Sequence, residues 1–125
     1  LDKADHIAKR LSKSIAVASF DDVQSALDQA TFVVNTTSLG MKGQPPLALE
    51  LTKLNDEAIV TDIVYVPLIT GLLKAAQDRG LTIVDGLGML LHQAAPGFEH
   101  WFGQRPRVTA ELRALIEADL FQVKP

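Results

Sequence analysis

The stretch "AIVTDIVYVPLITGLLKAAQDRGLTIVDGLG", residues 58–88, decides the fold. An apolar run rich in β-branched residues at 58–65 precedes a segment with helical periodicity at 67–80 and a second apolar run at 81–85. Two strands joined by a helix run parallel, because the crossover returns the chain to the same end of the sheet. The stretch therefore predicts an α/β protein with a parallel sheet and helices on both of its faces.

The same alternation extends upstream. Residues 2–11 carry apolar residues at helical spacing, and 14–20 and 31–35 have the composition of strands. Residues 21–30 predict a helix opened by an Asp cap between those two strands. The segment 36–49 holds so many Gly, Pro and hydroxyl residues that it predicts a long loop.

The last third of the chain is helical in pattern. An apolar helix is expected from about Gly88 to Trp101, followed by a turn at 103–107 and a helix capped by Thr109. Pro96 lacks the N–H that would bond the fourth residue before it, so we expect it to kink or end the first of these helices.

Composition restricts the class of protein. The chain has 125 residues, 47% hydrophobic and 22% charged, which suits one globular unit. A formal charge of -3 argues against a nucleic-acid partner, and the absence of cysteine excludes disulfides and thiolate metal sites. We expect a cytoplasmic protein. No apolar run approaches the roughly 18 residues of a membrane helix, so no membrane span is expected. Residue 1 is Leu, so we also expect a truncated chain.

Three segments follow predicted strands and are expected to share one rim of the sheet: 35–40, 62–67 and 85–89. Ligands of parallel α/β sheets bind beyond the carboxyl ends of the strands. The sequence therefore predicts a binding cleft at this rim.

The first two segments each allow two interpretations. The polar run that begins at Asn35 suits contacts to a ribose, a phosphate or a nicotinamide amide, but Asn, Thr and Ser also form ordinary capped turns, which residue types alone favour. Tyr65 precedes Pro67, which we expect to begin a helix, and its hydroxyl either donates to a substrate or is solvated above a packed ring. We expect Asp62 to hydrogen-bond the backbone of its own turn or to cap a helix, and not to act as a general base.

In the third segment, Gly86 and Gly88 would let a ligand approach the backbone at a helix start. Met89 and Gln93 lie four residues apart and so share a helix face. That pair suits a flat ring beside a hydroxylated substrate, although Met at this spacing is commonly core packing. The chain has no HExxH or GxSxG motif, so neither a metal site nor a nucleophilic serine is expected.

Taken in order, "VVNTTSLGM" at 33–41, "DIVYVP" at 62–67 and "GLGMLLHQAAPGFEHWFG" at 86–103 resemble the NADP-dependent shikimate dehydrogenase family. The resemblance covers essentially the whole chain. It implies a two-domain oxidoreductase that reduces 3-dehydroshikimate to shikimate with NADPH, in the route to aromatic amino acids.

The resemblance also implies roles for individual residues. Tyr65 and Gln93 would bind the substrate. The residues implied at the cofactor are Thr37, Ser38, Ile63, Gly86 and Met89.

The family's catalytic Lys and Asp lie in an amino-terminal substrate domain that this chain does not contain, so no catalytic residue is expected here and the chain alone is expected to be inactive. Residues 1–86 would form part of an NADP-binding Rossmann-like domain, and 87–125 the helices that pack on the absent domain. Strands 1 and 2 of a 3-2-1-4-5-6 sheet would be missing, which leaves an apolar edge on 31–35 that invites self-association.

Two alternatives remain open at the level of sequence. A quinate or quinate/shikimate dehydrogenase would use Tyr65 and Gln93 in the same way. A non-catalytic remnant would pair through the open sheet edge without handling cofactor. The choice between NADP and NAD is also open, because the residues that discriminate follow the missing second strand.

Overall fold

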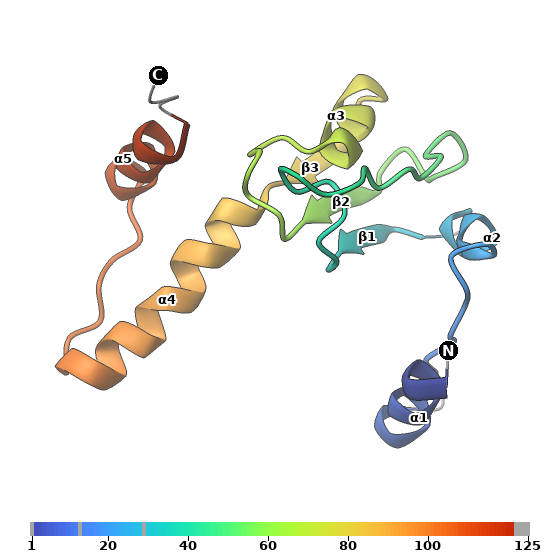
Figure 1. Ribbon diagram of the computed structural model, residues 1–125, viewed down its shortest axis with the longest axis horizontal. Helices are drawn as coiled ribbons and strands as arrows, with labels where there is room; N and C mark the ends of the chain where they lie inside the picture. The colour runs from blue at the N-terminus through green and yellow to red at the C-terminus, as the bar shows by residue number, and fades with distance from the viewer. Residues whose placement is uncertain (1, 13, 29, 122–125) are drawn as a thin grey trace.

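The computed structural model describes residues 2–12, 14–28 and 30–121 (Figure 1). In chain order its elements are α1 (Asp2–Leu11), α2 (Val23–Leu27), β1 (Phe32–Asn35), β2 (Ile59–Asp62), α3 (Gly71–Asp78), β3 (Thr82–Val84), α4 (Gly86–Phe102) and α5 (Ala110–Phe121).

The predicted parallel sheet is confirmed. Strand order is β1-β2-β3, with Val33 opposite Val60 and Val60 opposite Ile83. Asn35 lies opposite Asp62 at the carboxyl ends of β1 and β2. Because partners in register present their side chains on the same face, these two polar groups are brought together by the sheet itself.

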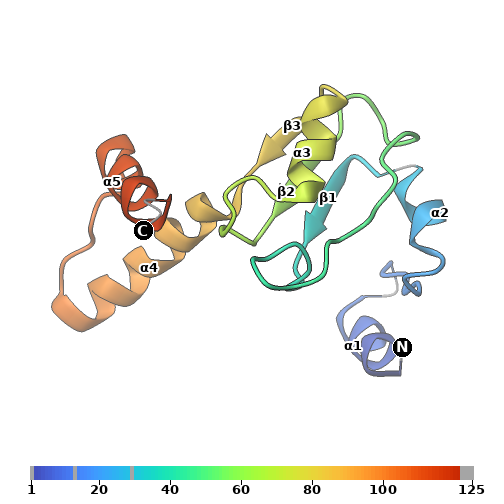
Figure 2. The same cartoon turned by 45° about the horizontal axis from the view of Figure 1, so that its top comes forward.

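The hydrophobic core lies on one face of the sheet. Val33 and Val60 pack there with Leu72, Leu73 and Ala76 of α3, which lies across β2 and β3 (Figure 2). The opposite face differs from the expectation of helices on both sides. Within the described residues it leaves four apolar side chains exposed: Phe32, Val34, Ile59 and Val84.

The prediction of a strand at 14–20 is wrong, because this segment has no regular structure. A strand is stable only when a neighbour accepts its backbone hydrogen bonds, and none of the described residues pairs with it. The helix predicted at 21–30 is shorter, Val23–Leu27, and residue 29 lies outside the described residues. The Asp22 side chain accepts from the Ser19 hydroxyl at 2.6 Å and does not cap the helix backbone.

The central helix also begins later than expected. Thr70, and not Pro67, precedes the first turn of α3, and its hydroxyl accepts a hydrogen bond from the Leu73 N–H at 3.4 Å. Gly80 follows the helix with a φ of 79°, the left-handed conformation that favours glycine just past a helix end. Tyr65 therefore lies in an irregular connection between β2 and α3.

Helix α4 begins at Gly86, two residues before the expected start, because Asp85 caps it by accepting from the Leu87 N–H at 3.0 Å. It continues without interruption past Pro96 to Phe102, so the expected end at Pro96 is wrong. His92 and Pro96 are both exposed, and water is available to the His92 carbonyl that loses its partner. The expected cap of α5 is confirmed by a 3.2 Å bond from the Leu112 N–H to the Thr109 hydroxyl.

The two ends of the chain lie on opposite sides of the sheet. Figures 1 and 2 show α4 and α5 projecting from one side and α1 beyond the other. None of the helices in the described part of the chain is long and apolar enough to span a membrane.

One side chain fastens the long segment between β1 and β2 to the end of α3. The Arg79 guanidinium donates to the backbone carbonyls of Leu51 and Leu54, whose side chains belong to the core. It also bonds the carboxylate of Asp56 at 2.9 Å, but that carboxylate is almost fully exposed. The two carbonyl bonds should therefore carry most of the stabilisation.

Replacing Arg79 by Met should lower the free energy of unfolding by about 2 kcal/mol, because two partly buried carbonyls lose their donors. Asp56→Asn is the matched control, and removing an exposed ion pair should cost less than about 0.5 kcal/mol. Urea denaturation measures both. Equal losses in the two variants would contradict a structural role for the carbonyl bonds.

Candidate functional site

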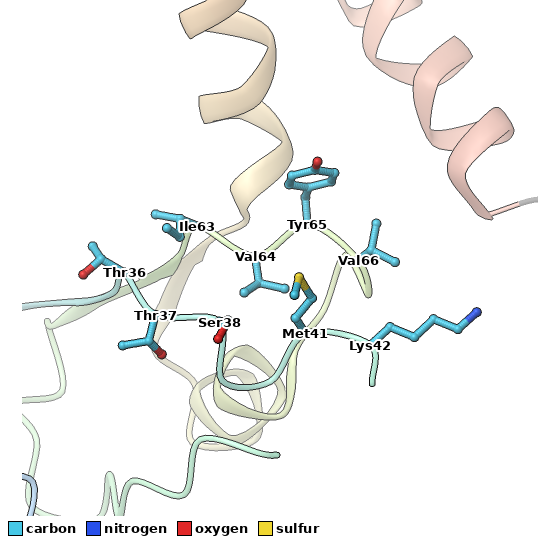
Figure 3. Close-up of a pocket in the computed structure, with 9 residues that line it drawn as sticks. All are labelled: Thr36, Thr37, Ser38, Met41, Lys42, Ile63, Val64, Tyr65 and Val66. Atoms are coloured by element: carbon cyan, nitrogen blue, oxygen red, sulfur yellow. The ribbon is translucent and has the colours of Figure 1, made fainter. Parts of the chain in front are cut away.

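The loop after β1 and the connection after β2 enclose a pocket of about 510 Å³ (Figure 3). The two sides are tied together by the Lys42 N–H, which donates to the Val66 carbonyl at 2.9 Å. The pocket is lined by Thr36, Thr37, Ser38, Met41, Lys42, Ile63, Val64, Tyr65 and Val66. Four of the seven residues expected at the site therefore share one pocket at the predicted rim.

A buried polar network sets the shape of this rim. The Asp62 side chain is only 1% exposed. Its carboxylate accepts from the Asn35 side-chain amide at 3.0 Å, from the Val64 N–H at 2.9 Å and from the Thr70 hydroxyl at 2.7 Å. One carboxylate thus joins the end of β1, the chain after β2 and the start of α3. The expectation that Asp62 hydrogen-bonds the backbone of its own turn is confirmed.

The network extends into the loop after β1. The side-chain oxygen of Asn35, Oδ1, accepts from the Thr37 N–H at 3.0 Å and from the Thr37 hydroxyl at 2.8 Å, while the Thr37 hydroxyl accepts from the Leu39 N–H at 3.1 Å. The capped-turn interpretation therefore holds for Asn35 and Thr37. The hydroxyl of Thr37 is engaged within the loop, whereas Ser38 is exposed at the pocket.

Gly86 brings the start of α4 against the end of β2. A Cβ built on Gly86 would lie 2.4 Å from the Ile63 carbonyl oxygen and 2.6 Å from that of Val64. Only glycine fits at such a distance, so the packing of α4 on this carbonyl explains the residue without any ligand. Gly86 is buried, next to the Ile63 backbone that lines the pocket.

Tyr65 lines the edge of this pocket, whereas Met89 and Gln93 lie farther along α4. Tyr65 points its ring away from Thr37 and Ser38 (Figure 3). Met89 is exposed on α4, and Gln93 lines a second hollow of about 380 Å³ formed by α4, the connection after it and Leu112 of α5. Within the described residues the structure therefore does not bring Tyr65 and Gln93 into one pocket.

An ion pair that the sequence patterns did not indicate joins α5 to the start of α4. The Arg113 guanidinium lies 2.8 Å from the Asp85 carboxylate and also 2.8 Å from that of Glu117. The bond to Asp85, with a smaller contribution from Glu117, raises the pKa of Arg113. Since 28 residues separate Arg113 from Asp85, no local spacing marks this pair.

At the start of α5, the backbone and the Thr109 hydroxyl lower the pKa of the exposed Glu111 carboxyl.

Among the described residues, no three His, Asp or Glu side chains gather closely enough to hold a metal ion.

Comparison with known protein families and sequences finds shikimate dehydrogenases among the relatives of this chain. A family model described as "Shikimate 5'-dehydrogenase C-terminal domain" matches residues 86–116. The chain is 60% identical over 119 residues to a shikimate dehydrogenase (NADP(+)) of Afipia carboxidovorans, covering 95% of this chain and 43% of the relative. It is 65% identical over 105 residues to that of Methylobacterium radiotolerans, covering 84% and 37%. The chain spans less than half the length of these relatives.

Solved structures agree with these matches. Quinate dehydrogenase from Corynebacterium glutamicum in complex with NAD is 29% identical with a TM-score of 0.80, over 94% of this chain and 43% of that one. Shikimate dehydrogenase from Aquifex aeolicus is 31% identical with a TM-score of 0.69, over 91% and 40%. The Thermus thermophilus enzyme in complex with NADP(H) and shikimate is 27% identical with a TM-score of 0.68, over 85% and 38%. The α/β fold class and the resemblance stated from the motifs are confirmed.

Thr70→Val should lower the free energy of unfolding by about 3 kcal/mol, because it removes the cap of α3 and leaves a buried Asp62 oxygen without a donor. Thr70→Ser keeps the hydroxyl and should cost about 1 kcal/mol for the lost methyl group. Denaturant titration of both variants measures the difference. A valine variant as stable as the serine variant would contradict the network.

Gly86→Ala should lower the free energy of unfolding by about 2 kcal/mol, because the added methyl group meets the Ile63 carbonyl. Gly97 lies in the same helix, and a Cβ there has no neighbour within 4 Å. Gly97→Ala should therefore stabilise the protein by up to about 1 kcal/mol. Thermal unfolding compares the two variants. Shifts of the unfolding temperature with the same sign and size in both would contradict the close packing of Gly86 against the Ile63 carbonyl.

Proposed function

Because the chain belongs to the shikimate dehydrogenase family and matches its C-terminal part, we propose that it supplies part of the cofactor and substrate site of an NADP-dependent shikimate dehydrogenase. The reaction is the reduction of 3-dehydroshikimate to shikimate, in which NADPH and a proton are consumed and NADP⁺ is released. The observation that carries the proposal is the pocket at the carboxyl ends of the strands, lined by the residues that the family resemblance implies.

The pocket suits the nicotinamide end of NADP(H), which supplies the hydride when bound. Val64 and Met41 offer apolar surface for a flat ring (Figure 3), and Ser38 offers a hydroxyl at the same pocket. We assign cofactor contacts to Thr37, Ser38, Ile63, Gly86 and Met89. With the Thr37 hydroxyl engaged inside the loop, its contribution is to shape the backbone that the cofactor meets.

Tyr65 and Gln93 are assigned to the substrate. The Tyr65 ring is directed away from the Ser38 side of the pocket, and Gln93 is exposed on α4. Neither side chain forms a hydrogen bond among the described residues, so the phenol and the amide are available to hydroxyl or carboxylate groups. Both residues orient the ring, and no residue of this chain is assigned the proton transfer.

We extend the proposal to the organisation of the chain. Residues 1–86 would form part of the NADP-binding domain, and 87–125 helices that contact a substrate domain outside this chain. The exposed aromatic side chains Phe98, Trp101 and Phe102 near the end of α4 support such a contact. The edge of β1 would allow self-association, and we propose a cytoplasmic location.

Quinate oxidation is the second candidate. The solved quinate dehydrogenase has a TM-score of 0.80 to this chain, above the values of the two shikimate dehydrogenases described above. Sequence favours shikimate, because the NADP(+) shikimate dehydrogenase of Afipia carboxidovorans is 60% identical whereas the quinate enzyme is 29% identical.

Turnover by the complete enzyme that carries this chain tests the proposal. NADPH absorbance should report a higher kcat/KM with shikimate and NADP⁺ than with quinate and NAD⁺. Tyr65→Phe and Gln93→Ala should each lower kcat/KM for shikimate by roughly 10- to 100-fold, the loss expected for one hydrogen bond to substrate. The 125-residue chain alone should be inactive.

Gln77→Ala is the matched control, because Gln77 is an exposed glutamine on α3, away from the pocket, and its loss should leave kcat/KM unchanged. A higher kcat/KM with quinate would favour the second candidate. Unchanged substrate affinity in Tyr65→Phe and Gln93→Ala would favour a non-catalytic remnant.

A further inference from the structure

Arg113 on α5 is joined to the residue that caps α4. Of the two Asp85 carboxylate oxygens, Oδ1 accepts from the Leu87 N–H at 3.0 Å and Oδ2 accepts from the Arg113 guanidinium at 2.8 Å. The Arg113 side chain is 33% exposed and that of Asp85 is 21% exposed. Partial burial makes this pair stronger than a fully solvated one, since water screens it less.

The guanidinium is also bonded on its own helix, and it lies close to the first turn of α4. Its Nε bonds Glu117 at 2.8 Å, one turn along α5. A Cβ added to Gly88 would lie 3.8 Å from one of its terminal nitrogens, so a larger side chain at that position would meet Arg113. Arg113 is thus seated against α4, and its position is fixed from both helices.

The capped turn that Arg113 holds borders the pocket. Gly86 is the first residue of α4 and packs against the Ile63 carbonyl, where a Cβ would lie only 2.4 Å from the oxygen. Met89 and Gln93 follow on the same helix, which moves as one rigid element. A displacement of the first turn of α4 therefore moves each α4 residue assigned to cofactor or substrate.

We propose that Arg113 is a positioning residue of the dehydrogenase site: through Asp85 it holds the capped first turn of α4, whose Gly86 packs against the end of β2. The inference rests on the function proposed above, since it assigns the nicotinamide end to this rim. Arg113 contacts neither cofactor nor substrate. Its effect falls on the geometry of hydride transfer, which is sensitive to displacements of about 1 Å.

Arg113→Met and Asp85→Asn in the complete enzyme test the proposal, because Asn retains an oxygen that caps α4 but loses the charge for Arg113. Each should lower kcat for shikimate oxidation roughly tenfold while KM for NADP⁺ changes less than about twofold. The kinetic isotope effect with shikimate deuterated at the oxidised carbon should rise, since hydride transfer becomes slower. Asp119→Asn removes an exposed carboxylate from the same helix, α5, and is the control that should leave all three values unchanged.

A second readout needs no turnover. Hydrogen exchange of the peptide 85–93 in the cofactor-free enzyme should be faster in Arg113→Met, and unchanged in Asp119→Asn. Arg113→Lys should restore part of the protection and part of kcat, because it keeps the charge but not the planar guanidinium.

Unchanged kcat and unchanged exchange in Arg113→Met would overturn the proposal. A fall of kcat that only follows the fraction of folded enzyme, with no change in the isotope effect, would assign Arg113 a purely structural role. Absence of shikimate and quinate turnover in the unsubstituted enzyme would instead overturn the proposed function. The exchange measurement would then decide on its own whether Arg113 holds α4.

Discussion

The carboxylate of Asp62 is the point on which the rim depends. It is buried, and its three hydrogen-bond donors come from β1, from the chain after β2 and from the residue that caps α3. A buried carboxylate is tolerated only when such donors surround it, so the three segments must keep one relative position. The irregular loops that line the pocket are therefore ordered by a polar core beneath them.

Around this fixed centre, several of the side chains that we propose to face a ligand are exposed. The exposed side chains are those of Ser38, Met89 and Gln93. The buried residues, which take part in hydrogen bonds or close packing, are Asn35, Asp62, Thr70 and Gly86. Such a division suits a binding site, because preorganised backbone lowers the entropy lost on binding while exposed polar groups supply specificity. Helix α4 packs against this centre at its first turn through Gly86, and the Asp85–Arg113 pair joins the same turn to α5.

The sequence predicted those features of the fold that depend on interactions between residues close together in the chain. The strands β1, β2 and β3, the glycine after α3 and the Thr109 cap of α5 follow from composition and capping within a few residues. The strand expected at 14–20 failed because pairing is a property of neighbours and not of composition. Pro67 was a weaker start signal than Thr70, whose hydroxyl is held by Asp62 from eight residues away.

The same distinction between local and long-range interactions applies to the candidate site. The three strand ends and the motif resemblance located the pocket and its Thr37, Ser38, Ile63 and Tyr65. The tight packing of Gly86 and the role of Arg113 depend on contacts between distant segments. No residue spacing in the sequence therefore predicted either of them.

A crystal structure of the complete enzyme with NADP⁺ and shikimate tests the central claim most directly. We predict the nicotinamide ring in the pocket beside Ser38 and the Ile63 backbone, with Gln93 hydrogen-bonded to the substrate. A nicotinamide ring bound elsewhere, with this pocket filled only by solvent, would contradict the assignment of the site.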